Sequence, residues 1–143
     1  MLDFSRSAET QPLLIVDDDE PFRNRLARAM EKRGFAVTTA ASVSEGCDVA
    51  HRDKPTYAVL DLRLEDGSGL EIVKALQGSQ PEARIIVLTG YGNIATTVAA
   101  VKAGAIDYLP KPADADAVAA ALLERENALP PPPENPMSAD RVK

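Results

Sequence analysis

Short runs of apolar residues alternate along this chain with longer stretches in which apolar and polar residues are mixed. The clearest runs, LLIV at 13–16 and IIVL at 85–88, are apolar at every position. Such continuous runs are typical of strands that are buried on both faces of a parallel sheet. We therefore predict strands at 13–16, 35–41, 57–60, 84–88 and 105–109.

The stretches between these runs have the apolar spacing of amphipathic helices. After the first run, Phe22, Leu26 and Met30 recur four residues apart and form one apolar face. Acidic residues with Pro21 at the start, and Gly34 at the end, are typical helix boundaries. We predict helices at about 19–33, 42–51 (capped by Ser42 or Ser44), from 70 onward, 94–104 and 114–127.

Five strands and five helices in strict alternation predict an α/β fold. Its sheet is parallel, with helices on both faces and right-handed crossovers. Five strands fit the flavodoxin-like (βα)5 order 2-1-3-4-5 better than the six-stranded dinucleotide-binding fold.

The two ends of the chain differ in composition from this central part. Residues 1–11 are polar, and we interpret them as a mobile leader to a folded domain at 12–127. Residues 128–143 contain four consecutive prolines, typical of an extended spacer, and then too few residues to fold. We therefore interpret 128–143 as a linker to a second domain that is absent from this chain.

Composition narrows the classes of function. The formal net charge of −6 disfavours direct binding of nucleic acid, which needs a basic face. One cysteine and one histidine, Cys47 and His51, exclude an intrachain disulfide, a cysteine- or histidine-based zinc site and a Ser-His catalytic pair. No apolar run approaches the roughly 18 residues of a membrane span, and the N-terminus is not a signal peptide. We expect a cytoplasmic protein that does not bind membranes.

Acidic residues follow two of the predicted strands. Asp17, Asp18 and Asp19 end the first strand, and Asp61 ends the third. In the order 2-1-3-4-5 these strands flank the topological switch point, where open α/β sheets bind ligands. Carboxylates so close together repel unless a cation neutralises them, and oxygen ligands of this kind suit Mg²⁺.

Two more strand ends lie at the same edge of the sheet. Thr89 follows the fourth strand and supplies a hydroxyl, and Lys111 follows the fifth and supplies an ammonium group. Acids, a hydroxyl and a lysine that converge on one pocket form a constellation for phosphoryl transfer. Asp61 is the natural nucleophile, because carboxylates form aspartyl phosphates.

With these residues the sequence resembles the receiver domain of two-component response regulators. The resemblance spans 12–127 and rests on VDDDEP at 16–21, LDLRLEDGSG at 60–69, LTGYG at 88–92 and DYLPKPAD at 107–114. It implies a phosphoacceptor that takes its phosphoryl group from a sensor histidine kinase. The implied roles are phosphoacceptor for Asp61, Mg²⁺ ligands for Asp17, Asp18, Asp61 and the Arg63 backbone carbonyl, switch residues for Thr89 and Tyr108, phosphoryl binding for Lys111, a cis peptide at Pro112, and a helix cap for Asp19.

The acidic leader, the motif VLTGYGNIATTVAAVKAG and the four-proline linker further resemble the RegA/PrrA/ActR redox regulators of alphaproteobacteria. That resemblance implies redox-responsive transcription regulation, a homodimer on phosphorylation, and DNA binding only through a helix-turn-helix domain beyond the linker. Phosphorylation would change the surface at which a partner docks. That surface is made by the helix at 94–104, the strand at 105–109 and the helix at 114–127. Ala113 departs from the family, in which many receivers carry Phe, and this puts the packing under the last helix in doubt.

Two other functions compete with this interpretation. A phosphohydrolase of the haloacid dehalogenase type needs a second acid two residues after its nucleophile, where this chain has Arg63. A pseudo-receiver used only for dimerisation would normally lack one of the acids, the threonine or the lysine, and all are present. We therefore expect a protein that is not an enzyme, although it accepts a phosphoryl group and can promote its own dephosphorylation.

Overall fold

Five parallel strands form the central sheet of the protein, in the order predicted from the apolar runs. The computed structural model describes residues 11–90 and 94–123. The strand order β2-β1-β3-β6-β7 is the predicted 2-1-3-4-5, because two short extra strands are numbered between the third and fourth of the sheet. The strands are β1 (Gln11–Val16), β2 (Phe35–Ala40), β3 (Tyr57–Asp61), β6 (Arg84–Thr89) and β7 (Asp107–Pro110).

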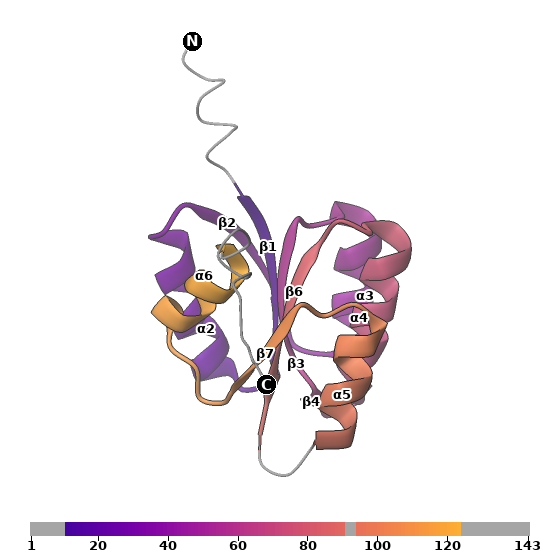
Figure 1. Ribbon diagram of the computed structural model, residues 1–143. Helices are drawn as coiled ribbons and strands as arrows, with labels where there is room; N and C mark the ends of the chain where they lie inside the picture. Colours follow the sequence, from indigo (N-terminus) through magenta and orange to yellow (C-terminus); the bar gives the residue numbers. More distant parts are fainter. Residues whose placement is uncertain (1–10, 91–93, 124–143) are drawn as a thin grey trace, which may run out of the picture.

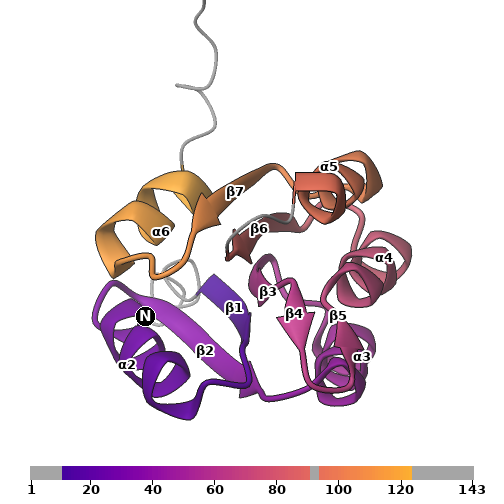
Figure 2. The same ribbon diagram turned by 90° about the horizontal axis from the view of Figure 1, so that it is seen from below.

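Helices cover both faces of the sheet (Figures 1 and 2). On one face lie α2 (Glu20–Glu31) and α6 (Ala115–Leu123). On the other lie α3 (Val43–Asp53), α4 (Leu70–Ser79) and α5 (Ile94–Ala103). Successive strand residues point to opposite faces, so each apolar run feeds two cores. Leu13 and Ile15 pack under α2 and α6, whereas Leu14 and Val16 pack under α3 and α4.

A short hairpin interrupts the connection from β3 to α4. Its strands β4 (Arg63–Leu64) and β5 (Gly67–Ser68) pair antiparallel in a separate two-stranded sheet. The sequence analysis predicted no strand between residues 61 and 69, because strands of two residues have no hydrophobic periodicity to reveal them.

Two strands start at other residues than predicted. The last strand begins at Asp107 and not at residue 105, because Ala105 is buried at the end of the preceding turn and the pairing with β6 starts at Asp107. Gln11, assigned to the leader, pairs with Phe35 as the first residue of β1. The rest of the leader, the four-proline linker and the end of the predicted last helix lie outside the described residues. Within the described part of the chain, no helix is long and apolar enough to cross a membrane.

Candidate functional site

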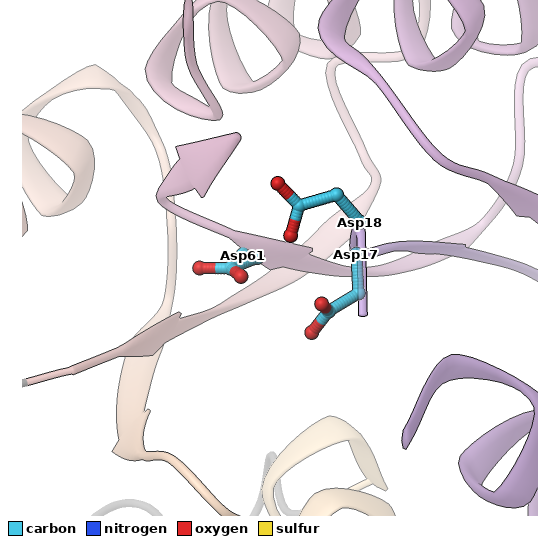
Figure 3. A group of neighbouring side chains, drawn as sticks. All are labelled: Asp17, Asp18 and Asp61. Carbon is cyan, nitrogen blue, oxygen red and sulfur yellow. The ribbon is translucent and has the colours of Figure 1, made fainter. Parts of the chain in front are cut away.

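Three carboxylates meet where β1 and β3 end (Figure 3). Asp17 and Asp18 follow β1, and Asp61 is the last residue of β3. One oxygen from each residue lies within 4.8 Å of the others. Asp17 is fully buried and Asp61 is 6% exposed, whereas Asp18 is partly exposed to solvent. The predicted acidic cluster is therefore present, with two members inside the protein and one at its surface.

Main-chain N–H groups orient the two buried carboxylates. Asp17 Oδ1 accepts a hydrogen bond from the N–H of Asp19 at 2.9 Å, and Asp61 Oδ1 accepts one from the N–H of Arg63 at 3.0 Å. Asp19 itself caps α2, accepting from the N–H of Phe22 as predicted. Each carboxylate is thus fixed by the backbone two residues further along the chain.

Lys111 links the two buried carboxylates from the end of β7. Its Nζ lies 3.0 Å from Asp61 Oδ2 and 2.9 Å from Asp17 Oδ2, and it donates to Asp17 Oδ1 at 3.0 Å. The ammonium also lies 5.1 Å from the centre of the Phe22 ring, within range of a cation–π interaction. The peptide bond from Lys111 to Pro112 is cis, which confirms that prediction.

Burial and charge act against each other in this cluster. Burial raises the pKa of Asp17, and the charge of Asp61 adds to this, although the N–H of Asp19 and Lys111 oppose the shift. Burial by itself would lower the pKa of Lys111, but its hydrogen bonds to Asp17 and Asp61 outweigh that effect and the pKa is raised. The lysine therefore stays charged, and one ammonium among three carboxylates leaves the cluster negative.

The cluster has the donor set of a site for a hard divalent cation. Asp17 Oδ2 is buried and accepts no hydrogen bond, although the ammonium of Lys111 lies beside it. The partly exposed Asp18 completes a set of three carboxylate oxygens. Three carboxylates that share a single ammonium fit a further cation that prefers oxygen ligands.

Thr89 and Tyr108 lie on the two neighbouring strands. The Thr89 hydroxyl donates to the carbonyl of Gly90 at 3.0 Å, so in this structure it is engaged with its own loop and not with Asp61. Tyr108, in β7, is 52% exposed. The structure thus brings Lys111 onto the carboxylates, and it places Thr89 at the end of β6 and Tyr108 within β7.

Apolar side chains gather on the surface formed by α5, β7 and α6, which we call the α5–β7–α6 face. It corresponds to the face expected to carry the signal. The exposed large apolar residues of the described chain are all on it or on its connecting turn: Ile94, Val98, Val101, Ile106, Tyr108 and Leu123. Contiguous exposed apolar patches are typical of interaction surfaces.

The departure at Ala113 is accommodated by packing. Ala113 is half-buried against the core cluster that includes Phe22 and Leu26. It also lines a hollow of about 430 Å³ beside α2. The small side chain therefore leaves space at the surface and does not disrupt the core under α6.

Sequence analysis missed Asp66. Its carboxylate accepts hydrogen bonds from the N–H groups of Val43 and Ser44, at the start of α3. The local signal was the Asp66-Gly67 pair, which is typical of a tight hairpin. Nothing local to residue 66 indicates its partners, which lie more than twenty residues earlier in the chain.

Comparisons with known proteins agree with this geometry. The family model described as response regulator receiver domain matches residues 13–123. The photosynthetic apparatus regulatory protein RegA of Cereibacter sphaeroides is 66% identical over 131 residues, covering 92% of this chain and 71% of that protein. The acid tolerance regulatory protein ActR of Rhizobium meliloti is 63% identical over 131 residues, covering 92% and 68%.

Solved structures share the fold. A response regulator protein from Burkholderia pseudomallei, crystallised with a phosphorylated aspartic acid and a calcium ion, has a TM-score of 0.74 and 43% identity over 82% of this chain and 73% of that chain. A CheY-like receiver domain protein from Methanospirillum hungatei has a TM-score of 0.76 and 28% identity over 80% and 92%. With its flavodoxin-like sheet, its acidic cluster and these relatives, the chain belongs to the receiver-domain family of two-component response regulators.

Proposed function

We propose that Asp61 accepts a phosphoryl group from a phosphohistidine of a sensor histidine kinase. The observation that carries the proposal is the position of Asp61: its carboxylate is held between the N–H of Arg63 and the ammonium of Lys111, next to Asp17 and Asp18. A nucleophile fixed in this way pays little orientation entropy when the phosphoryl donor arrives.

In the transfer, a carboxylate oxygen of Asp61 attacks phosphorus and forms an acyl phosphate. The bond from phosphorus to the imidazole nitrogen breaks, and the nitrogen keeps its electron pair. Lys111 lies where it can neutralise the charge of the phosphoryl oxygens. We assign Asp17, Asp18, Asp61 and the Arg63 carbonyl as ligands of Mg²⁺, which when bound would screen the repulsion between the carboxylates and the phosphoryl group.

The signal then passes through Thr89 and Tyr108. A phosphoryl group on Asp61 adds acceptor oxygens, and we infer that the Thr89 hydroxyl leaves the Gly90 carbonyl to donate to one of them. The exposed Tyr108 ring can turn into the space that Thr89 vacates. This repacks the α5–β7–α6 face, a two-state change that a few kcal/mol can bias.

The remaining parts of the proposal concern the whole regulator. Phosphorylation promotes a homodimer through the apolar α5–β7–α6 face, and DNA is bound only through a helix-turn-helix domain beyond the four-proline linker. The similarity to RegA, a photosynthetic apparatus regulatory protein, and to ActR, an acid tolerance regulatory protein, supports a role in regulation. We propose that this role is redox-responsive transcription regulation, as the resemblance noted from the sequence implies. We further propose that the protein is cytoplasmic and that the site promotes loss of its own phosphoryl group.

Labelling with acetyl phosphate tests the central step. Wild-type protein should incorporate phosphoryl groups in the presence of Mg²⁺ and lose most of that incorporation when the metal is chelated. Asp61→Asn should not be labelled, because the amide is not a nucleophile. Asp48→Asn changes an exposed aspartate on α3 and should label like wild type. Label that persists on Asp61→Asn would refute the assignment, and dimerisation of an unlabelled wild type would favour a pseudo-receiver.

A further inference from the structure

The tip of the β4–β5 hairpin is attached to the start of α3. Asp66 lies in the two-residue loop between β4 and β5. Its Oδ1 accepts from the N–H of Val43 at 2.8 Å, and its Oδ2 accepts from the N–H of Ser44 at 3.2 Å. The first N–H groups of a helix lack partners within the helix and carry its positive end, so they are strong sites for a carboxylate. Consistent with this, the Val43 N–H lowers the pKa of Asp66, and the Ser44 N–H adds to the shift.

Local side chains also accept from N–H groups at the start of α3 and just before it. Ser42 Oγ accepts from the N–H of Glu45 at 3.1 Å, and Glu45 Oε1 accepts from the N–H of Ala41 at 2.8 Å. The Ser42 hydroxyl therefore caps α3 through the N–H of Glu45 without help from the hairpin. The bonds to Asp66 satisfy the N–H groups of Val43 and Ser44, and they join the start of α3 to the hairpin tip.

The other end of the hairpin holds Asp61. Arg63 pairs with Ser68 in the hairpin, and its N–H donates to Asp61 Oδ1 at 3.0 Å. Strands of two residues have few hydrogen bonds of their own, and an isolated two-stranded hairpin is marginal in water. Leu64 anchors the hairpin in the core. Among the described residues, the other anchor at the tip is Asp66, since its loop neighbour Glu65 makes no hydrogen bond or ion pair there.

We propose that Asp66 is a positioning residue of the phosphoacceptor site. By fixing the hairpin tip to α3, it fixes the backbone of Arg63, and the N–H of Arg63 fixes the Asp61 carboxylate. The effect on metal binding rests on the proposed function, in which Asp61 and the Arg63 carbonyl are ligands of Mg²⁺. If these two groups are held less firmly, Mg²⁺ should bind less tightly. The structural step can be measured without metal or phosphoryl donor.

The test compares three variants by amide hydrogen exchange of Arg63 in metal-free protein and by calorimetric titration with Mg²⁺ alone. Asp66→Ala should speed exchange of the Arg63 amide about tenfold, because the hairpin opens more often. It should weaken Mg²⁺ binding about 10-fold, the lower end of the range for residues that support metal ligands. Asp66→Asn keeps one acceptor oxygen. Its Arg63 exchange rate and its affinity for Mg²⁺ should therefore lie between those of Asp66→Ala and wild type, a graded effect at this one amide that a role in global stability alone does not predict.

Glu65→Ala is the matched control. It removes one negative charge from the same exposed loop and leaves the bonds to α3 intact. We expect wild-type exchange and wild-type affinity for Mg²⁺. Equal weakening by Glu65→Ala and Asp66→Ala would overturn the proposal, since loss of charge would then be the cause. Unchanged exchange of Arg63 in both Asp66 variants would also overturn it. Failure of wild type to be labelled by acetyl phosphate would refute the proposed function instead, without touching the exchange result.

Discussion

Replacing Lys111 with methionine tests how much the buried charges of the site depend on one another. The substitution keeps an unbranched side chain and removes the ammonium group that lies 2.9 Å from Asp17 Oδ2 and 3.0 Å from Asp61 Oδ2. Asp17 and Asp61 then remain buried and negative with no cation between them. Lys111→Met should therefore destabilise the metal-free protein at neutral pH.

The structure sets the size of this effect. At an effective dielectric constant of about 20, opposite charges at these distances attract by about 5 kcal/mol, and desolvation offsets much of that gain. Removing one partner of a buried pair typically costs about 3–5 kcal/mol. The Lys111 side chain is 22% exposed, so water already screens the ammonium, and we expect a loss of about 2–4 kcal/mol.

The sign of the pH dependence follows from Asp17. Burial holds its pKa above the ordinary value of 3.8, and loss of Lys111 removes an interaction that lowers it. A raised pKa in the folded state favours the folded protein as the pH falls, since the folded state then takes up the proton more readily than the unfolded chain. The difference in unfolding free energy between variant and wild type should therefore shrink below neutral pH.

Urea unfolding with and without Mg²⁺ measures these differences. In EDTA the variant should unfold at a lower urea concentration than wild type, and saturating Mg²⁺ should stabilise it more than wild type because the dication replaces the missing charge. Lys102→Met, an exposed lysine with no ion pair in the part of the chain that the structure describes, is the control and should unfold like wild type. Equal stability of Lys111→Met and wild type in EDTA would show that the lysine does not neutralise the carboxylates.

Two further substitutions address the loop and the switch. Gly69→Ala would place a Cβ 2.2 Å from the backbone oxygen of Asp61. We expect the free energy of unfolding in urea to fall by about 1–3 kcal/mol and labelling by acetyl phosphate to be weaker. Gly78→Ala, on α4 with open space around it, should instead match or exceed wild-type stability, and the same loss in both variants would contradict the steric explanation. Thr89→Ala should still be labelled at Asp61, but beryllofluoride should no longer shift the Tyr108 ring signals in NMR spectra; a wild-type response would exclude the Thr89 route.

The sheet is predictable from sequence because each central strand is buried on both faces. LLIV at 13–16 must be apolar throughout when alternate residues enter different cores, and this pattern has no other common explanation in a chain with a helix after each run. The strand order then brings Asp17, Asp18 and Asp61 together, since the carboxyl ends of β1 and β3 are adjacent. The strand order is therefore sufficient to predict the acidic site, without separate prediction of contacts between residues that are distant in the sequence.

The hairpin and its anchor are not predictable in the same way. Two-residue strands give no periodic signal, and the partners of Asp66 lie more than twenty residues earlier in the chain. The start of β7 is likewise ambiguous, because Ala105 and Ile106 continue the apolar run although the pairing with β6 begins at Asp107. Local pattern identifies elements that are long and buried, and it does not show side-chain bonds that join distant loops.

The hydrogen bond that orients Asp61 comes from the main chain of Arg63, and the Arg63 side chain is exposed. Every amino acid except proline supplies that N–H group. Residue 63 can therefore change without loosening the nucleophile beside it. After a regulator gene is duplicated, the new copy has to avoid phosphorylation by the kinase of the original protein. The exposed side chain at position 63 can change to alter recognition by a kinase, while the main chain continues to orient Asp61. Proline is the one replacement that such divergence has to avoid.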